Sequence, residues 1–165
     1  MGQFDTFKRR VVDTAQLLIE KDYFKGTAGN LSVRAEGHQA FAITLALIDA
    51  PIPALFDEQV RFLGRSVDVI SYAPSGTTFL KRNVKSGLCN GHNAYILQNH
   101  GVLVLGPSAE RAVHNLELLE KCALAYLLAL CTGCKVTRIP LAIREIAFAK
   151  LRQDEKKFAK RGRHV

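Results

Sequence analysis

The sequence predicts a layered α/β domain, in which strands alternate along the chain with the helices that cover them. Apolar residues recur at helical spacing in several segments, and short β-prone runs bounded by Gly and Pro stand between these segments. With 165 residues and 48% hydrophobic content, the chain is long enough to bury a core, and no linker divides it. We therefore expect one domain over residues 1–165.

The first third of the chain begins with a predicted helix. Residues 4–22 carry apolar side chains at helical spacing, and Gly26 and Gly29 then end the pattern. Residues 30–34 fit a short strand that leaves this turn. Residues 40–48 are almost wholly apolar, so their periodicity does not decide between a buried helix and a buried strand.

The middle of the chain alternates strand and helix signals. Residues 67–72 predict a strand, and a Pro-Ser-Gly turn leads into a helix over 78–86. Residues 94–98 and 102–105 are β-prone and predict two strands that meet at the Asn-His-Gly turn of residues 99–101.

Two further helices follow. Ser108 is a typical N-cap, Glu110 suits the positive end of the helix dipole, and Gly133 marks the end of the longer helix. A last helix is predicted over 140–158. The apolar stripe expected to bury the longer helix consists of Leu116, Leu119, Ala123, Leu127 and Leu130.

The formal net charge of +8 is concentrated at the C-terminal end of the chain. We interpret residues 149–165 as an exposed helix end and a solvated basic tail. No recognition helix, zinc-finger spacing or aromatic-interleaved motif accompanies these charges, so nucleic acid is not expected as a partner. The basic residues are Lys150, Arg152, Lys156, Lys157, Lys160, Arg161 and Arg163.

The sequence predicts a cytoplasmic protein without a membrane partner. No run approaches the roughly 18 apolar residues of a membrane span, and residues 1–10 are polar and charged. The four cysteines do not form a disulfide framework in a chain of this size, so we expect reduced thiols.

Two turns carry residues that could bind a ligand. In the first, glycines allow close approach of the backbone to a ligand, and Thr27, Asn30 and Ser32 offer neutral hydrogen bonds to phosphate or carboxylate oxygens. The second holds His100 on a bend between two strands, where its imidazole could be aimed at a metal. Taken alone, each turn is better explained as a structural one.

Four ordered segments together resemble the class II aldolase/adducin family. They are GTAGNLSVR after the first helix, PIPALFDEQVRFLG, VISYAPSGT, and AYILQNHGVLVLGPSAERAVHNLELLEKCALAYL. The last is the most specific, because its apolar run, NHGV turn and glycine-started helix stand in the family's order and spacing.

The resemblance implies a fold and a chemistry. The family fold is a three-layer α/β/α domain with a mainly antiparallel central sheet, assembled as a homotetramer. Its enzymes use zinc, or another divalent metal, to cleave small sugar phosphates by retro-aldol chemistry. By this resemblance His100 matches a metal-binding histidine. Gly29 and Asn30 match the part of the site that holds the phosphate end of the substrate, and Thr27 lies in the same turn.

The chain departs from the family pattern after GNLSVR. The Thr-Pro-Ser-Gly segment, the catalytic glutamate and the His-x-His pair are missing. One register places residues 43–48 on the Thr-Pro-Ser-Gly strand. A second, which fits better, makes His38 the second histidine of the pair and puts Glu36 in place of the first.

The second register gives a metal-site hypothesis. Residues two apart on an extended segment point to one side, so Glu36 and His38 could converge with His100 on one ion. The alternative is that the deletion leaves Glu36 and His38 on a solvated loop.

The missing glutamate leaves the catalytic residues unassigned. Asp57 and Glu58 are expected in a surface loop, and Glu117 and Glu120 on the polar face of the long helix. Proton transfer by such a group contributes roughly 10² to 10⁴ in rate, so we expect aldol cleavage to be slow.

Two alternatives to an enzyme remain open. One is a non-catalytic assembly module comparable to the head of adducin, and the other is an internally deleted copy without activity. His92 and His114 lack partners at ligand spacing and are interpreted as surface residues.

Overall fold

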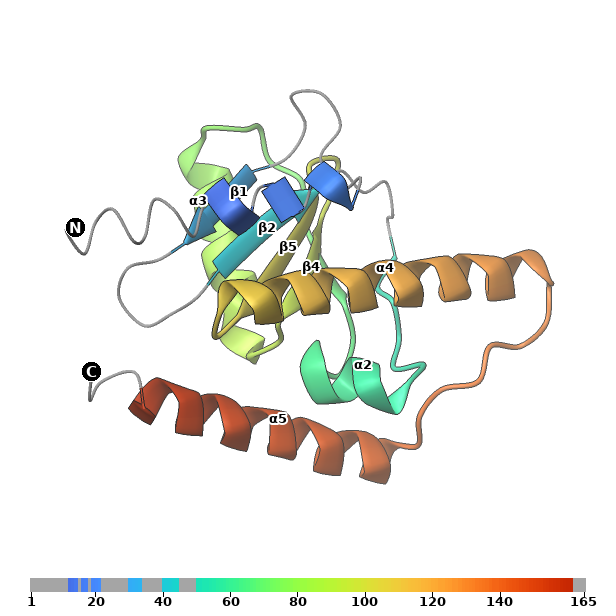
Figure 1. Cartoon of the computed structure of the whole chain (residues 1–165). Helices are drawn as coiled ribbons and strands as arrows, with labels where there is room; N and C mark the ends of the chain where they lie inside the picture. Colours follow the sequence, from blue (N-terminus) through green and yellow to red (C-terminus); the bar gives the residue numbers. More distant parts are fainter. Residues whose placement is uncertain are drawn as a thin grey trace.

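The chain folds around one sheet that is flanked by helices (Figure 1). Residues 12–14, 16–17 and 19–20, within the predicted first helix, are helical. The computed structural model describes residues 12–14, 16–17, 19–21, 30–33, 40–44 and 50–161.

The sheet has five strands in the order β1-β2-β5-β4-β3. Its pairings are antiparallel except between β3 and β4, which run parallel, so the sheet is mixed. The predicted α/β class is confirmed, and the undecided apolar run begins with a strand. The strands are β1 (Asn30–Val33), β2 (Ala40–Thr44), β3 (Asp68–Ile70), β4 (Ala94–Leu97) and β5 (Gly101–Gly106).

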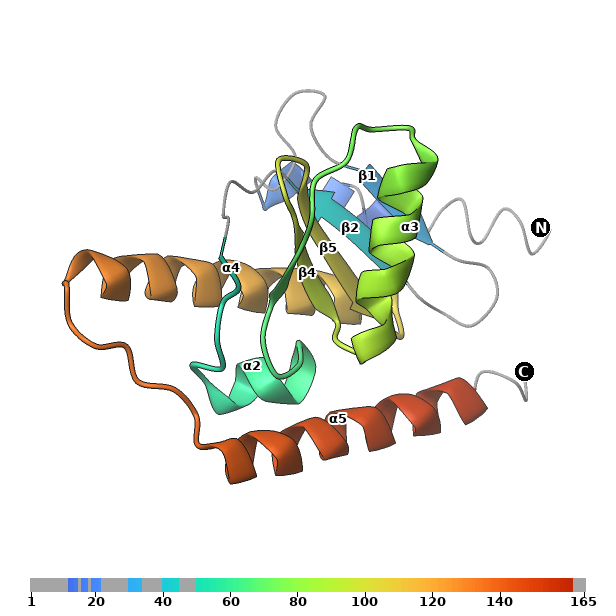
Figure 2. The ribbon, with the colours of Figure 1, turned by 180° about the vertical axis from the view of Figure 1, so that it is seen from behind.

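Helices lie on both faces of the sheet. Helix α4 (Ala109–Cys131) crosses one face and packs on β5, β2 and β4, whereas α3 (Thr78–Gly87) lies behind the sheet and contacts β3 (Figures 1 and 2). The short η1 (Leu88–Asn90) follows α3 and leads into β4. All four residues of β4 are buried, as expected for a strand covered on both faces.

Beneath the sheet, α2 (Asp57–Phe62) packs against α5 (Leu141–Arg161). Val60 of α2 and Phe148 and Leu151 of α5 form a small buried cluster. The prediction that Asp57 and Glu58 lie in a loop is wrong, because they form the exposed first turn of α2, where carboxylates favour the helix dipole.

The basic residues near the C-terminus lie on α5 as far as the helix extends. Arg152 pairs with Glu155 at 2.8 Å, and Asp154 pairs with Arg61 of α2. Arg152 also donates to the backbone oxygen of Gly91 at 3.3 Å, so the basic end is partly engaged with the rest of the domain. No helix in the described ranges is long and apolar enough to cross a membrane.

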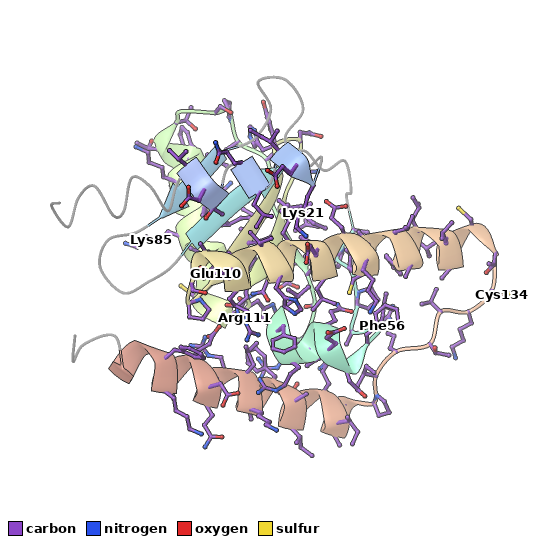
Figure 3. All side chains as sticks on the ribbon, in the orientation of Figure 1. Lys21, Phe56, Lys85, Glu110, Arg111 and Cys134 are labelled. Carbon is purple, nitrogen blue, oxygen red and sulfur yellow. The ribbon has the colours of Figure 1, made fainter. Side chains whose placement is uncertain are left out.

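Helix α4 begins and ends as predicted but is buried over only half its length. Ser108 Oγ accepts a hydrogen bond from the backbone N of Arg111 at 3.2 Å, and Gly133 has a φ of 69° just after the helix. Leu116 is fully buried, but Leu127 is 58% exposed. The predicted stripe is wrong in its second half, because α4 projects past the edge of the sheet (Figure 1). Cys134, labelled in Figure 3, lies just beyond the outer end of the helix.

The polar face of α4 is contacted by side chains from other parts of the chain. Lys21, labelled in Figure 3, forms an ion pair with Glu117. His114 is half-buried, with its ring edge-on to Phe62 at a centroid distance of 5.3 Å. The surface interpretation therefore holds only in part for His114.

The surface interpretation of His92 is wrong. Its side chain is 5% exposed, and Nδ1 lies 3.2 Å from Asp68 Oδ2, an ion-pair distance without good hydrogen-bond geometry. Asp68 also accepts hydrogen bonds from Ser66 Oγ at 2.6 Å and Asn90 Nδ2 at 2.7 Å. The contact with His92, with help from Ser66 and Asn90, lowers the pKa of Asp68 against the opposing effect of burial.

Asp68→Asn tests this network. Because the folded-state pKa lies below the ordinary value of 3.8, ionised Asp68 stabilises the fold above that pH, and the contribution is lost as pH falls through the lower folded value. We expect the variant to lose about 1 kcal/mol at neutral pH in urea unfolding, with the difference from wild type shrinking in acid. Asp57→Asn is the matched control, and an equal, pH-independent loss in both variants would contradict the assignment.

Candidate functional site

His100 lies on the tight turn between β4 and β5. Its backbone N donates to Leu97 O at 2.9 Å, and the residues on either side have positive φ: 58° at Asn99 and 130° at Gly101. Asn and Gly are the residues that adopt this backbone conformation most readily. The predicted placement of His100 on a turn between two strands is confirmed.

A loop from the neighbouring strand contacts the His100 ring. Nε2 lies 2.7 Å from the carbonyl oxygen of Ala73, and Nδ1 lies 3.3 Å from Ser75 Oγ. The Tyr72 ring stacks on the imidazole, with centroids 5.3 Å apart and planes inclined by 16°. Both ring nitrogens and one ring face are therefore in contact with residues that follow β3.

This loop is held in place by its own hydrogen bonds. Gln98 N donates to Ile70 O at 3.1 Å, and Tyr72 N donates to Gln98 Oε1 at 3.1 Å. From α3, Asn83 Nδ2 donates to Ser71 O at 3.1 Å. Residues 71–75 are thus anchored both to the turn that bears His100 and to the following helix.

The two hydrogen bonds of the His100 ring define which of its nitrogens carries the proton. A carbonyl oxygen can only accept, so Nε2 carries the proton and Nδ1 accepts from the Ser75 hydroxyl. A metal needs a ring nitrogen with a free lone pair, so coordination by His100 requires the exchange of one of these hydrogen bonds.

The predicted phosphate-binding turn enters the sheet at the same end as His100. Asn30 begins β1 opposite Ile43, and β2 ends at Thr44 opposite Val102, two residues after His100. Thr27 and Gly29 lie outside the described residues. The strand register therefore brings the start of β1 to the end of the sheet where His100 lies.

Glu36 and His38, predicted as the other metal ligands, also lie outside the described residues. Val33 and Ala40, on either side of them, pair with each other, and Ala40 pairs with Gly106. Gly106 ends β5, whereas His100 precedes its start. At about 3.4 Å per residue, the separation between these two residues is about 20 Å along the strand.

No group of three His, Cys, Asp or Glu side chains within the described ranges is arranged to hold a metal ion. Of the predicted metal set, His100 is the member that the structure places, and the full set stays a prediction. The described residues alone do not fit a metal centre.

Sequence reasoning missed Tyr72 and Ser75 as neighbours of His100. Both lie in the VISYAPSGT segment, which supports the family resemblance but gives no sign of its spatial partner. Their proximity depends on the parallel pairing of β3 with β4, which places Ile70 beside Leu97. A parallel partner is separated by a crossover connection, so local sequence patterns do not reveal it.

Comparison with known proteins identifies related folds. The family model described as Class II Aldolase and Adducin N-terminal domain matches residues 37–127. An L-fuculose 1-phosphate aldolase superposes with a TM-score of 0.73 at 22% identity, covering 89% of this chain and 96% of that one. YgbL from Klebsiella pneumoniae, a putative aldolase/epimerase/decarboxylase, gives 0.70 at 18% identity, covering 89% and 99%.

A sugar-phosphate aldolase from Thermotoga maritima has a TM-score of 0.59 at 15% identity, covering 81% of this chain and 99% of that one. A search among curated protein sequences gives no match. At these identities, the solved structures show a shared fold.

The contacts of His100 predict its tautomer. In neutral imidazole, Nε2 should carry the proton, because the Ala73 carbonyl can only accept. Long-range ¹H–¹⁵N spectra recorded in alkaline buffer, where imidazole is neutral, should show this form in wild type and in Ser75→Ala, which leaves the Ala73 contact intact. A signal from the Nδ1-protonated form in wild type would contradict the geometry.

Proposed function

Because the chain belongs to the class II aldolase and adducin family, we propose that it is a metal-dependent lyase that cleaves a small sugar phosphate by retro-aldol chemistry. The observation that carries the proposal is the position of His100, on a turn at the end of the sheet where β1 begins at Asn30. Two proteins of similar fold are named as aldolases of L-fuculose 1-phosphate and of a sugar phosphate.

Each predicted residue has a role in this proposal. Zinc or another divalent ion would be held by His100 with Glu36 and His38, and would act as a Lewis acid on the substrate carbonyl. Thr27, Gly29 and Asn30 would hold the phosphate end. Ser75 and the Ala73 carbonyl orient the His100 ring, and Tyr72 covers one of its faces.

The absence of the family's glutamate segment limits the expected rate. A positioned acid/base group contributes roughly 10² to 10⁴ in rate, and the sequence offers no obvious substitute at the corresponding place. We therefore propose turnover well below that of a family member with the complete segment.

Metal content and turnover test this proposal together. Purified protein should contain about one divalent ion per chain by elemental analysis. His100→Ala should lose the ion and the release of aldehyde from a panel of sugar phosphates, whereas His114→Gln should keep both. Glu36→Gln and His38→Ala test the other two ligands. Wild-type protein that binds no divalent ion in metal-supplemented buffer would refute the lyase.

A specific observation favours a second candidate, a non-catalytic module that assembles with copies of itself. The outer half of α4 and the first turns of α5 expose large apolar side chains that these helices leave in solvent. On α4 they recur at the spacing of one helix face, which suits pairing with the same ridge of a second copy. These residues are Leu124, Leu127, Leu128, Leu141, Ile143 and Ile146.

Solution mass measures the assembly directly. We expect light scattering coupled to size exclusion to report a homo-oligomer, a tetramer by family resemblance, for wild type. The double variant Leu124→Glu/Leu128→Glu should shift the mass toward the monomer, because it puts charge on the exposed ridge. Phe79→Glu, on the equally exposed Phe79 of α3, is the control and should leave the mass unchanged. A monomeric wild type would rule out the assembly module.

A further inference from the structure

A cavity of about 460 Å³ lies where the chain enters α5, away from His100. Its walls are fixed by backbone hydrogen bonds: Ile52 and Val67 exchange two, at 3.0 and 2.9 Å, and Ile139 N donates to Ala54 O at 2.8 Å. This volume is in the range of small-molecule pockets, roughly 300 to 1,000 Å³. The cavity is therefore a fixed feature of the fold and large enough for a metabolite.

Three arginines line this cavity, and two of them have spare donors. Arg65 is engaged, because it binds Glu145 through Nε at 2.8 and 2.9 Å and lies over the Phe148 ring at 3.8 Å. Arg144 contacts Glu145 through Nε at 3.4 Å, and its terminal nitrogens have no partner in the described part of the chain. Arg138 is exposed and, within the same residues, has no hydrogen bond or ion pair.

The local charge is positive even after the nearby carboxylates are counted. Arg65, Arg138 and Arg144 carry three positive charges, against the two negative charges of Asp68 and of Glu145, which Arg65 and Arg144 share, so the net charge is +1. Arg138 is left without a counter-ion among the described residues. Free guanidinium donors on a concave surface are suited to the oxygens of a phosphate group.

We propose that this cavity binds the phosphate group of a small metabolite, through Arg138 and the terminal nitrogens of Arg144. Tyr126, which also lines it, offers a hydroxyl group to the rest of such a ligand. The Ser66 hydroxyl, whose proton is donated to Asp68, can accept a hydrogen bond there. The site is separate from the one around His100. Asp68, on the wall of the cavity, is the first residue of β3. Ile70, the last residue of β3, pairs with Leu97, which comes just before the turn that bears His100. The cavity is thus a second anion site, independent of the proposed lyase chemistry.

Glycerol 3-phosphate is the probe, with binding measured by calorimetry on the full chain at low ionic strength. We expect saturable binding in wild type and at least about a tenfold loss of affinity in Arg138→Ala/Arg144→Ala. Arg138→Ala alone, which removes an exposed side chain without a described partner, should weaken binding without affecting the fold. Arg82→Ala makes the same charge change on α3, outside the cavity, and should bind like wild type.

Two further arms complete the test. Asn30→Ala, at the phosphate end of the proposed active site, and His100→Ala should both bind the probe like wild type, which separates this site from the proposed active site. Inorganic phosphate identifies the source: equal affinity indicates a free oxyanion as the ligand, and weaker binding indicates a phosphate ester. The proposal is overturned if wild type shows no saturable binding, if affinity survives in the double variant, or if Arg82→Ala loses as much.

Discussion

The parallel pairing of β3 with β4 is the constraint on which the rest of the structure depends. Parallel neighbours need a crossover, and here α3 and η1 provide it behind the sheet. At one end of the pair, the residues that follow β3 meet the turn that follows β4, so Ala73 and Ser75 reach His100. At the other end, Asp68 meets His92, which is buried before β4 begins. One pairing therefore creates both polar clusters.

Much of the fold could be predicted because its signals are local. Ser108 caps α4 through its side chain, whereas Gly133 after the helix and Asn99 and Gly101 around His100 act by the conformation of their own backbones. Burial was harder to predict. Leu127 has the same periodicity as Leu116, but it lies on a part of α4 that extends past the sheet. Periodicity identifies the apolar face of a helix, but not how much of its length has a neighbour to cover it.

The residues of the candidate site also differ in whether the sequence could predict them. His100 could be found from sequence because its turn is compact and the family resemblance is strong there. Tyr72 and Ser75 could not, since their contact with His100 needs a long-range pairing. The metal-site hypothesis relied on side-chain alternation within one extended segment. The strand register is a further constraint on this hypothesis. Val33 and Ala40, which flank Glu36 and His38 in sequence, lie at the end of the sheet where Gly106 lies, far from the turn that bears His100.

The stacking of Tyr72 on His100 gives the protein an optical property. The chain has no tryptophan and only four tyrosines, so phenol emission is not masked by indole. Tyr72 is half-exposed and lies parallel to an imidazole, whereas Tyr95 is buried in the other cluster. A positive charge on an imidazole stacked on a phenol ring interacts electrostatically with the π face of that ring. The intrinsic fluorescence of the unlabelled chain therefore includes the emission of a ring stacked, at a centroid distance of 5.3 Å, on the residue on which its proposed chemistry depends.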